Sequence, residues 1–237
     1  MLRWSVWLHK WIGLIVSVQV LFWVLGGLIM TAIPIERVRG EHHAAVGPPP
    51  ASLDMTRVIP AAEVADRIGF SLSEATLKAT PMGAIWMLKS ASGPQAWFDA
   101  YTGAAAPELG ERQARAVAAA AYAGDAAPIE ARRFEDAPPE VRSDRQLWRV
   151  TFGDRERTRL YIDSFTGEVV SRRSEIWRFY DFWYRLHLMS FAPEPSYNHP
   201  LIVGTTALTL LIVLTGFLLL WIKVGRDLRA ALSRRSS

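Results

Sequence analysis

Two long runs of apolar residues constrain this chain more than any other feature. The first run extends from Trp11 to Ile35 and the second from Pro200 to Ile222, and neither contains a charged residue. At about 1.5 Å per residue, a helix of either length crosses a hydrocarbon layer about 30 Å thick. Because a buried helix of a soluble protein seldom stays uncharged for so long, the sequence predicts two transmembrane helices.

A cleaved signal peptide is the alternative interpretation of the first run. The basic residues Arg3 and Lys10 ahead of it would fit a signal peptide. However, the apolar core of a signal peptide is about 7–15 residues long, and no clear Ala-x-Ala cleavage site follows this run. We therefore expect a retained transmembrane helix.

The distribution of charge predicts the topology. The net charge is +4, to which the first ten residues contribute +2 and the last fifteen contribute +4, so the middle of the chain carries −2. Basic residues flank the cytoplasmic ends of membrane helices, which places both termini in the cytoplasm and the middle of the chain on the other side of the membrane. The basic balance thus reports topology and does not indicate nucleic-acid binding. The absence of cysteine excludes disulfides, thioether-linked haem and cysteine-ligated iron–sulfur clusters.

The segment between the two runs predicts a doubled α+β domain of roughly 160 residues. Each half begins with a short helix and continues with a pair of strands. The predicted helices are Pro60–Gly69 and Glu111–Ala123, and the predicted strand pairs are 84–89 with 95–101 and 146–152 with 159–165.

An internal sequence match supports this duplication. The segment Trp97–Gly103 (WFDAYTG) matches Tyr161–Gly167 (YIDSFTG), and upstream Trp86 matches Trp148. The second copy has two more residues between its paired positions, and an even insertion keeps each side chain on its own face of a sheet. The shared Asp-x-x-Thr-Gly ending predicts a turn in which Gly takes a positive φ.

An aromatic segment precedes the second apolar run. Ile176–Phe191 is rich in Trp, Tyr and Phe and has charges at Arg178, Asp181 and Arg185. This composition predicts an amphipathic helix that lies at the outer membrane surface or dips into it. A Pro-rich turn, Ala192–Pro200, then leads into the second span, and the Pro-rich segment Glu41–Ala51 is expected to be a stiff linker.

Several motifs resemble those of the PepSY-associated transmembrane family. They are Leu8–Leu14 (LHKWIGL) at the start of the first span, Arg185–His187 (RLH) before the last span and Thr215–Trp221 (TGFLLLW) within it. The doubled units ending in Asp-x-x-Thr-Gly resemble PepSY domains. Larger members of this family have four spans and include iron-regulated membrane proteins and ferric-siderophore reductases that carry haem between histidines. With two spans, this chain resembles half of such a protein.

The resemblance and the residue patterns together predict a membrane α-helical plus α+β protein. Two transmembrane helices flank an extracytoplasmic domain of two PepSY-like helix-plus-hairpin repeats. The expected parts are the N-terminal end and first span (1–35), a linker (36–55), the two repeats (56–110 and 111–175), the aromatic helix (176–192), the second span (200–223) and a basic cytoplasmic tail (224–237).

The five histidines all lie near the ends of the predicted spans. None falls between Ala51 and Glu175, so we expect cofactor chemistry in the membrane part and not in the repeats. Neutral imidazole is the usual axial ligand of haem b. His9 and His187 match the Leu-His motifs of the family, which implies that they ligate haem iron. The plainer interpretation is that both are interfacial residues.

Other residues complete the candidate haem sites. His9 and the outer end of the first span are nearly 40 Å apart along a helix (~25 residues), so His9 and His187 are expected to serve two separate sites. A two-fold homodimer would supply the second ligand of each site, and His199 or His42 is the alternative partner on the outer side. Trp11 and Trp183 are expected to pack against the porphyrin.

Two functions remain open at this point. The first is electron transfer by haem b across the membrane to a ferric siderophore or similar periplasmic acceptor, as in a haem-dependent ferric reductase. The second is a non-enzymatic, membrane-anchored PepSY module that binds a protein, or an accessory subunit of a larger membrane complex. Both place the chain in the lipid bilayer, as a homodimer or within a larger complex, and neither involves nucleic acid.

Overall fold

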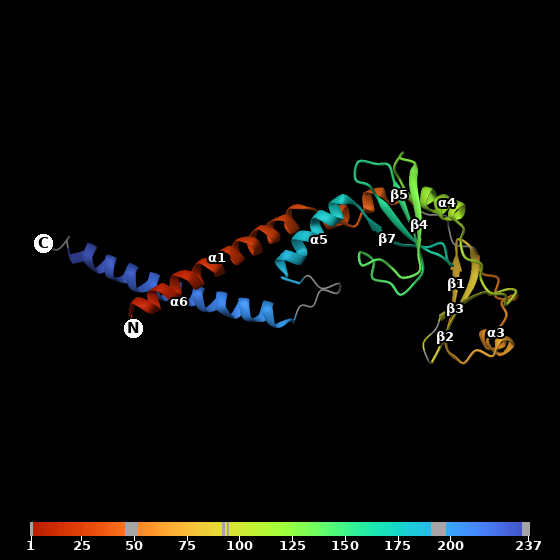
Figure 1. Ribbon diagram of the computed structural model, residues 1–237, viewed down its shortest axis with the longest axis horizontal. Helices are drawn as coiled ribbons and strands as arrows, with labels where there is room; N and C mark the ends of the chain where they lie inside the picture. The colour runs from red at the N-terminus through yellow and green to blue at the C-terminus, as the bar shows by residue number, and fades with distance from the viewer. Residues whose placement is uncertain (1, 46–51, 92, 94, 191–197, 234–237) are drawn as a thin grey trace. The chain divides into compact units, whose positions relative to one another are not determined.

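The computed structural model describes residues 2–45, 52–91, 93, 95–190 and 198–233 (Figure 1). The chain divides into two units. The membrane unit comprises residues 1–33 and 180–237, and the sheet unit comprises residues 34–179. Parts of the predicted linker (46–51) and of the predicted turn before the second span (191–197) lie outside the described residues, as does the end of the basic tail (234–237).

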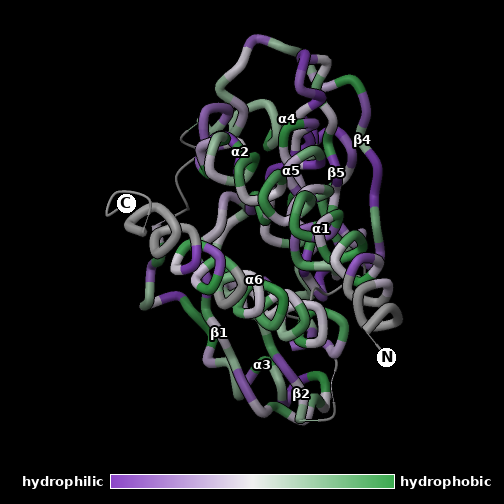
Figure 2. Tube along the Cα trace, turned by 90° about the vertical axis from the view of Figure 1, so that its left-hand side faces the viewer, coloured by the Kyte–Doolittle hydropathy of each residue, from purple (hydrophilic) through white to green (hydrophobic). Residues whose placement is uncertain are grey.

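Two long helices dominate the membrane unit. They are α1 (Leu2–Ala32) and α6 (Pro200–Ser233), which contact each other. Their apolar stretches, Lys10–Ala32 and Pro200–Arg226, are long enough to cross a membrane. Large apolar side chains along both helices are exposed, and the hydrophobic colour follows both helices in Figure 2. Exposed apolar surface on this scale requires a nonaqueous partner, and lipid provides it.

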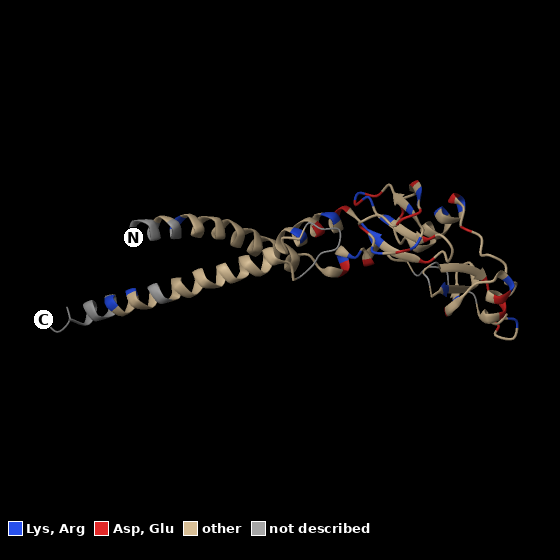
Figure 3. Ribbon diagram, turned by 60° about the horizontal axis from the view of Figure 1, so that its bottom comes forward, with Lys and Arg blue, Asp and Glu red and all other residues tan. Residues whose placement is uncertain are grey.

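Charged residues are concentrated in the sheet unit. Figure 3 shows Lys, Arg, Asp and Glu spread over that unit, while the long helices are almost free of them over most of their described length. Helix α5 (Glu175–His187) begins in the sheet unit and ends in the membrane unit. It is shorter than the predicted helix 176–192, of which residues 191 and 192 are not described.

The sheet unit contains two helix-plus-sheet modules. In the first, α3 (Ala61–Ile68) precedes the antiparallel sheet β1-β2-β3 (Leu72–Thr80, Gly83–Ser90 and Gln95–Asp99). In the second, α4 (Glu111–Ala121) precedes the antiparallel sheet β4-β5-β6-β7 (Pro128–Phe134, Leu147–Phe152, Arg159–Asp163 and Val169–Arg173). The predicted strand pairs are present as β2 with β3 and β5 with β6, whereas β1, β4 and β7 were not predicted.

The same contacts hold each helix to its sheet. Trp86 Nε1 donates to the carbonyl of Ile59, just before α3, and Trp148 Nε1 donates to the carbonyl of Leu109, just before α4. The residues preceding the helices are also bound through their backbone to the end of a strand, since Ile59 N donates to Ala100 O and Leu109 N donates to Ser164 O. The sequence match between the modules therefore corresponds to one repeated set of hydrogen bonds.

The Asp-x-x-Thr-Gly turns are also alike in the two modules. Asp99 Oδ1 accepts hydrogen bonds from the backbone amides two and three residues later, those of Tyr101 and Thr102. Asp163 Oδ1 accepts the equivalent two hydrogen bonds in its own turn. The glycines that close the turns have φ values of 71° at Gly103 and 69° at Gly167, which confirms the predicted positive φ.

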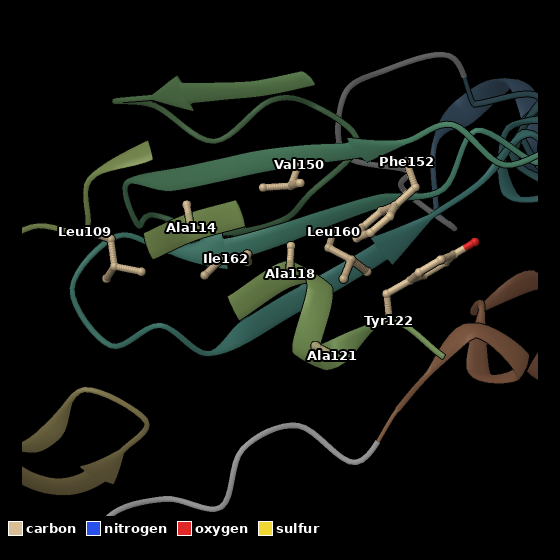
Figure 4. Packing of buried hydrophobic residues seen from close by; sticks show 9 residues of the cluster. All are labelled: Leu109, Ala114, Ala118, Ala121, Tyr122, Val150, Phe152, Leu160 and Ile162. Carbon is tan, nitrogen blue, oxygen red and sulfur yellow. The ribbon is translucent and has the colours of Figure 1, made fainter. Parts of the chain in front are cut away.

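Each module has its own core. In the first, Val64 and Ala65 of α3 pack against Leu88 and Phe98 of the sheet. In the second, one face of α4 packs against the sheet β4–β7 (Figure 4). That face consists of small residues, Ala114, Ala118 and Ala121, which let the helix approach the sheet closely.

Helix α4 ends two residues earlier than predicted. Tyr122 adopts an extended conformation (φ −105°, ψ 123°), and its ring stacks on Phe152 with the ring centroids 4.0 Å apart. Its backbone forms an antiparallel bridge with Ala44. This tertiary pairing ends the helix at Ala121.

The segment expected to be a linker is partly folded. It contains α2 (Ile35–Val38) and the 3₁₀ helix η1 (Glu41–His43). Gly40, with φ 71°, connects the two, and Val38 is buried. The chain therefore packs against the sheet unit as soon as it enters that unit.

The two turn aspartates differ in burial, and this difference predicts unequal effects on stability. Asp163 is buried and also pairs with Arg145 (Oδ2 to Nη1, 3.1 Å), whereas Asp99 is only partly buried. We expect Asp163→Ala to lower the free energy of unfolding by about 3 kcal/mol and Asp99→Ala by about 1 kcal/mol, because water replaces the lost acceptor only at the more exposed turn. Denaturant unfolding of the intact protein, followed by near-UV circular dichroism, measures both. Equal losses would contradict this account.

Candidate functional site

The last turns of α5 pack against α1 at a glycine. A Cβ atom added at Gly26 would lie 3.1 Å from His187 Cβ and 3.3 Å from the Trp183 carbonyl oxygen. Both distances are shorter than ordinary van der Waals contacts, so a side chain at this position would force its neighbours to shift. The close helix approach that Gly26 and Gly27 permit is thus made by α5, within the membrane unit.

Two reciprocal hydrogen bonds fix His187 at this contact. Trp23 Nε1 donates to the backbone carbonyl of His187 (2.6 Å), and His187 Nδ1 donates to the backbone carbonyl of Trp23 (2.9 Å). A carbonyl can only accept, so the proton of the neutral His187 ring is on Nδ1. The lone pair is then on Nε2, to which no described residue hydrogen-bonds.

The position of Trp23 along α1 places this contact deep in the membrane unit. Nine residues separate Trp23 from the end of α1 at Ala32, which corresponds to about 14 Å of helix rise. Helix α5 therefore descends well below the end of the candidate span. Its charged residues are paired, since Arg185 Nε lies 2.7 Å from Asp181 Oδ2. Such pairing is the usual condition for ionised groups beside membrane-spanning helices.

His199 lies close to the end of α5. Its Nε2 donates to the carbonyl of Leu188, the residue after His187, over 3.2 Å. It immediately precedes α6, which starts at Pro200. The structure thus brings the His199 side chain to the C-terminal end of α5.

The remaining predicted site residues are spread over α1 and α5. His9 lies in α1, fourteen residues before Trp23 or about 21 Å along the helix, so it is far from His187. Its side chain is outside the part that the structure describes. Trp11 is exposed, with its ring 6.3 Å from that of Trp7. Trp183 lies in α5, with its ring edge-to-face against Phe182 at 5.6 Å.

Trp23 is the residue of this site that sequence reasoning missed. Its indole N–H lies in the middle of an apolar run, where no water is available as a hydrogen-bond acceptor. A buried donor of this kind requires a partner outside its own helix backbone. The sequence could therefore have indicated that Trp23 contacts another part of the chain, because its indole N–H needs an acceptor.

A second group of histidines lies in the sheet unit. His42 and His43 face Glu156, with His42 Nε2 3.2 Å from Glu156 Oε2. His42, expected as an alternative partner of His187, is hydrogen-bonded to this carboxylate. Beneath them, burial and the nearby Asp154 carboxylate raise the pKa of Tyr122 to about 12. Tyr122 therefore stays neutral and donates its hydroxyl hydrogen to Asp154.

The tight contact at Gly26 yields a direct test of the α1–α5 packing. We expect Gly26→Val to destabilise the membrane unit by about 1–3 kcal/mol, because the new side chain meets His187 and a backbone carbonyl. Gly13→Val is the matched control in the same helix, since no atom of the described residues that could clash lies within 4 Å of a Cβ at Gly13. Thermal unfolding in detergent compares the two. If Gly13→Val lowers the melting temperature as much as Gly26→Val does, the packing described here is wrong.

Comparison with known proteins identifies the family. The model of the PepSY-associated TM region matches residues 6–237, almost the whole chain. No curated protein and no solved structure matches the chain. The family match, together with two exposed apolar helices of membrane length, identifies a membrane protein. The chain belongs to the PepSY-associated transmembrane family.

Proposed function

We propose that the membrane unit binds haem b through His187 and serves in electron transfer. The observation that carries this proposal is the hydrogen bond from His187 Nδ1 to the Trp23 carbonyl. Histidines that ligate a metal almost always donate their other ring N–H to such an acceptor, which fixes the tautomer and the ring orientation. His187 is thus prepared to offer Nε2 to iron.

The surroundings of His187 support the same proposal. Haem b sites are helix-lined and poor in water, and imidazole is the usual axial ligand in them. His187 lies beside Trp23, about 14 Å below the end of α1. When bound there, haem would supply a one-electron carrier whose potential depends on its axial ligands and on burial.

His199 is the second ligand that this chain offers on the same side. Its Nε2 is used by the Leu188 carbonyl, so its Nδ1 is the nitrogen left to bind iron. Alternatively, a homodimer supplies His187 of a second copy. His9, about 21 Å away along α1, belongs to a separate site near the opposite membrane surface.

The topology that we propose follows from the basic flanks of the spans. Both termini lie in the cytoplasm, and the two helix-plus-sheet modules, proposed to be PepSY modules, lie on the periplasmic side of the inner membrane. Electrons would then pass outward, from the His9 side to the His187 side. A ferric siderophore or a similar oxidised acceptor is the substrate class that suits this direction.

The haem content of purified variants tests this proposal. The protein purified from haem-replete cells should be red, and reduction with dithionite should sharpen the Soret band. We expect His187→Ala to lose at least half of the bound haem, as does His9→Ala if two sites exist, because each substitution removes an axial ligand. A pyridine haemochrome assay gives the ratio of haem to protein.

His43→Ala is the matched control for this experiment. It also removes an imidazole, but in the sheet unit, and should leave the haem content unchanged. A colourless protein would overturn the electron-transfer proposal and would favour the non-enzymatic anchor. Full haem content in both His9→Ala and His187→Ala would show that the ligands are assigned wrongly.

A further inference from the structure

The segment that follows α1 is built into the second module by backbone pairing. Ala45 N donates to Ala121 O, and Ala123 N donates to His43 O, both over 3.1 Å. Gly40 makes the turn into η1, and its left-handed conformation (φ 71°) disfavours other residues. A Cβ at Gly40 would also lie 3.4 Å from Arg172 Cβ. The backbone around His43 is therefore held in place.

Aromatic stacking fixes the His43 ring. Its centroid lies 5.4 Å from that of Tyr122, at an interplanar angle of 30°. Tyr122 in turn stacks on Phe152 in the core of the second module (Figure 4). The His43 ring is thus packed against the core of the second module. The centroid of the His42 ring lies 4.0 Å from that of His43.

A tight turn between β5 and β6 delivers Glu156 to these imidazoles. Asp154 Oδ1 accepts the Thr158 amide hydrogen over 2.7 Å, and Arg157 adopts a positive φ of 48°. The backbone carbonyl of Glu156 accepts the amide hydrogen of Glu175 over 2.8 Å. The carboxylate of Glu156 is therefore positioned from both sides of the turn.

The three side chains converge with the spacing of metal ligands. Glu156 Oε2 lies 3.2 Å from His42 Nε2 and 3.5 Å from His43 Nε2, and the three ligand atoms lie within 4.8 Å of one another. In a tetrahedral zinc site with bonds of about 2.0–2.1 Å, neighbouring ligand atoms are about 3.3–3.4 Å apart. The two distances from Glu156 Oε2 lie on either side of that value, and the two Nε2 atoms are at most 4.8 Å apart.

Hydrogen bonding alone leaves this cluster incomplete. His43 Nε2 is buried, and it forms no hydrogen bond with any residue that the structure describes. A buried polar atom without a hydrogen-bond partner destabilises the folded state. Such atoms often mark positions where a ligand or an ion binds. Arg37 approaches the other carboxylate oxygen, Oε1, at 3.7 Å, so Oε2 remains directed at the histidines.

We propose that His42, His43 and Glu156 bind a divalent first-row transition metal ion. Two imidazoles and one carboxylate suit Zn²⁺, Cu²⁺ or Ni²⁺, whereas Ca²⁺ and Mg²⁺ prefer sites made of oxygen alone. Both imidazoles would bind through Nε2, with their protons on Nδ1.

Asp154 completes the surroundings of the metal. Its Oδ2 lies 3.7 Å from His43 Nε2 and accepts the Tyr122 hydroxyl hydrogen. It is thus a further carboxylate beside the metal, and a water molecule or an external ligand takes the open position. The metal ties the segment that follows α1 to the second module, so its binding stabilises the folded sheet unit.

Calorimetric titration of the intact, untagged protein in detergent with ZnCl₂ tests the site. We expect binding of one ion per chain, a higher melting temperature with Zn²⁺ and no binding of Mg²⁺. Glu156→Gln and His42→Ala should each weaken Zn²⁺ binding by roughly tenfold or more, because each removes one ligand. Glu156→Gln keeps the shape of the side chain, so its effect does not depend on a disturbed fold.

Glu41→Gln is the matched control for charge. Glu41 lies in the same 3₁₀ helix as the two histidines and pairs with Arg39, but it is not part of the cluster. This variant should keep the affinity of the original chain to within roughly twofold. Electron paramagnetic resonance of the Cu²⁺ complex should show coupling to imidazole nitrogens that is reduced in His42→Ala.

The proposal is overturned if the protein binds no Zn²⁺ stoichiometrically, or if Glu156→Gln and His42→Ala both bind it as the original chain does. The outcome is independent of haem. His187→Ala should keep the Zn²⁺ site, just as His43→Ala should keep the haem.

Discussion

The reciprocal hydrogen bonds between Trp23 and His187 are the interaction on which the membrane unit depends. The carbonyl of the last residue of a helix has no partner within the helix, and an apolar environment offers no water to replace it. Trp23 Nε1 satisfies that carbonyl at the end of α5, and His187 Nδ1 binds back to the backbone of α1. Gly26 makes both contacts possible by letting the helices meet without a side chain between them. One structural requirement thereby fixes the tautomer of the histidine that carries the functional proposal.

In both modules of the sheet unit, a tryptophan supplies a hydrogen-bond donor to a backbone carbonyl that precedes the helix. In each module an indole N–H satisfies the carbonyl just before the helix, at Ile59 and at Leu109. Each of these tryptophans also packs against the core of its own module. Tryptophan suits the position because it combines a large apolar surface with a single donor. The two modules therefore share an equivalent hydrogen bond as well as a similar hydrophobic pattern.

How much could be predicted from the sequence depended on how local each signal is. The apolar helices, α3, α4 and the strand pairs β2–β3 and β5–β6 follow from composition and from short repeated motifs, and the even insertion correctly kept Trp86 and Trp148 equivalent. Strands β1, β4 and β7 were missed because they lack a matching motif, and their strand state depends on pairing with a neighbour. The sequence did not decide where α5 packs. An aromatic amphipathic helix can lie on the membrane surface, or it can pack against a glycine of a neighbouring helix, as α5 does at Gly26.

The grouping of His42 and His43 with Glu156 was the larger omission, and its cause is physical. Their partner Glu156 is more than a hundred residues away in the sequence, and the turn that presents it, Asp154–Thr158, has an ordinary surface composition. Only the pairing of residues 44 and 45 with the end of α4 brings the two segments together. The histidines that lie near the spans in the sequence therefore divide into two chemically different sets. His187, with one nitrogen committed to a backbone carbonyl in an apolar unit, suits a macrocyclic iron complex, whereas two adjacent imidazoles facing a carboxylate suit a bare metal ion. The absence of histidine from the repeats does not make the sheet unit chemically inert, because the chain brings its own imidazoles to the sheet unit from the end of α1.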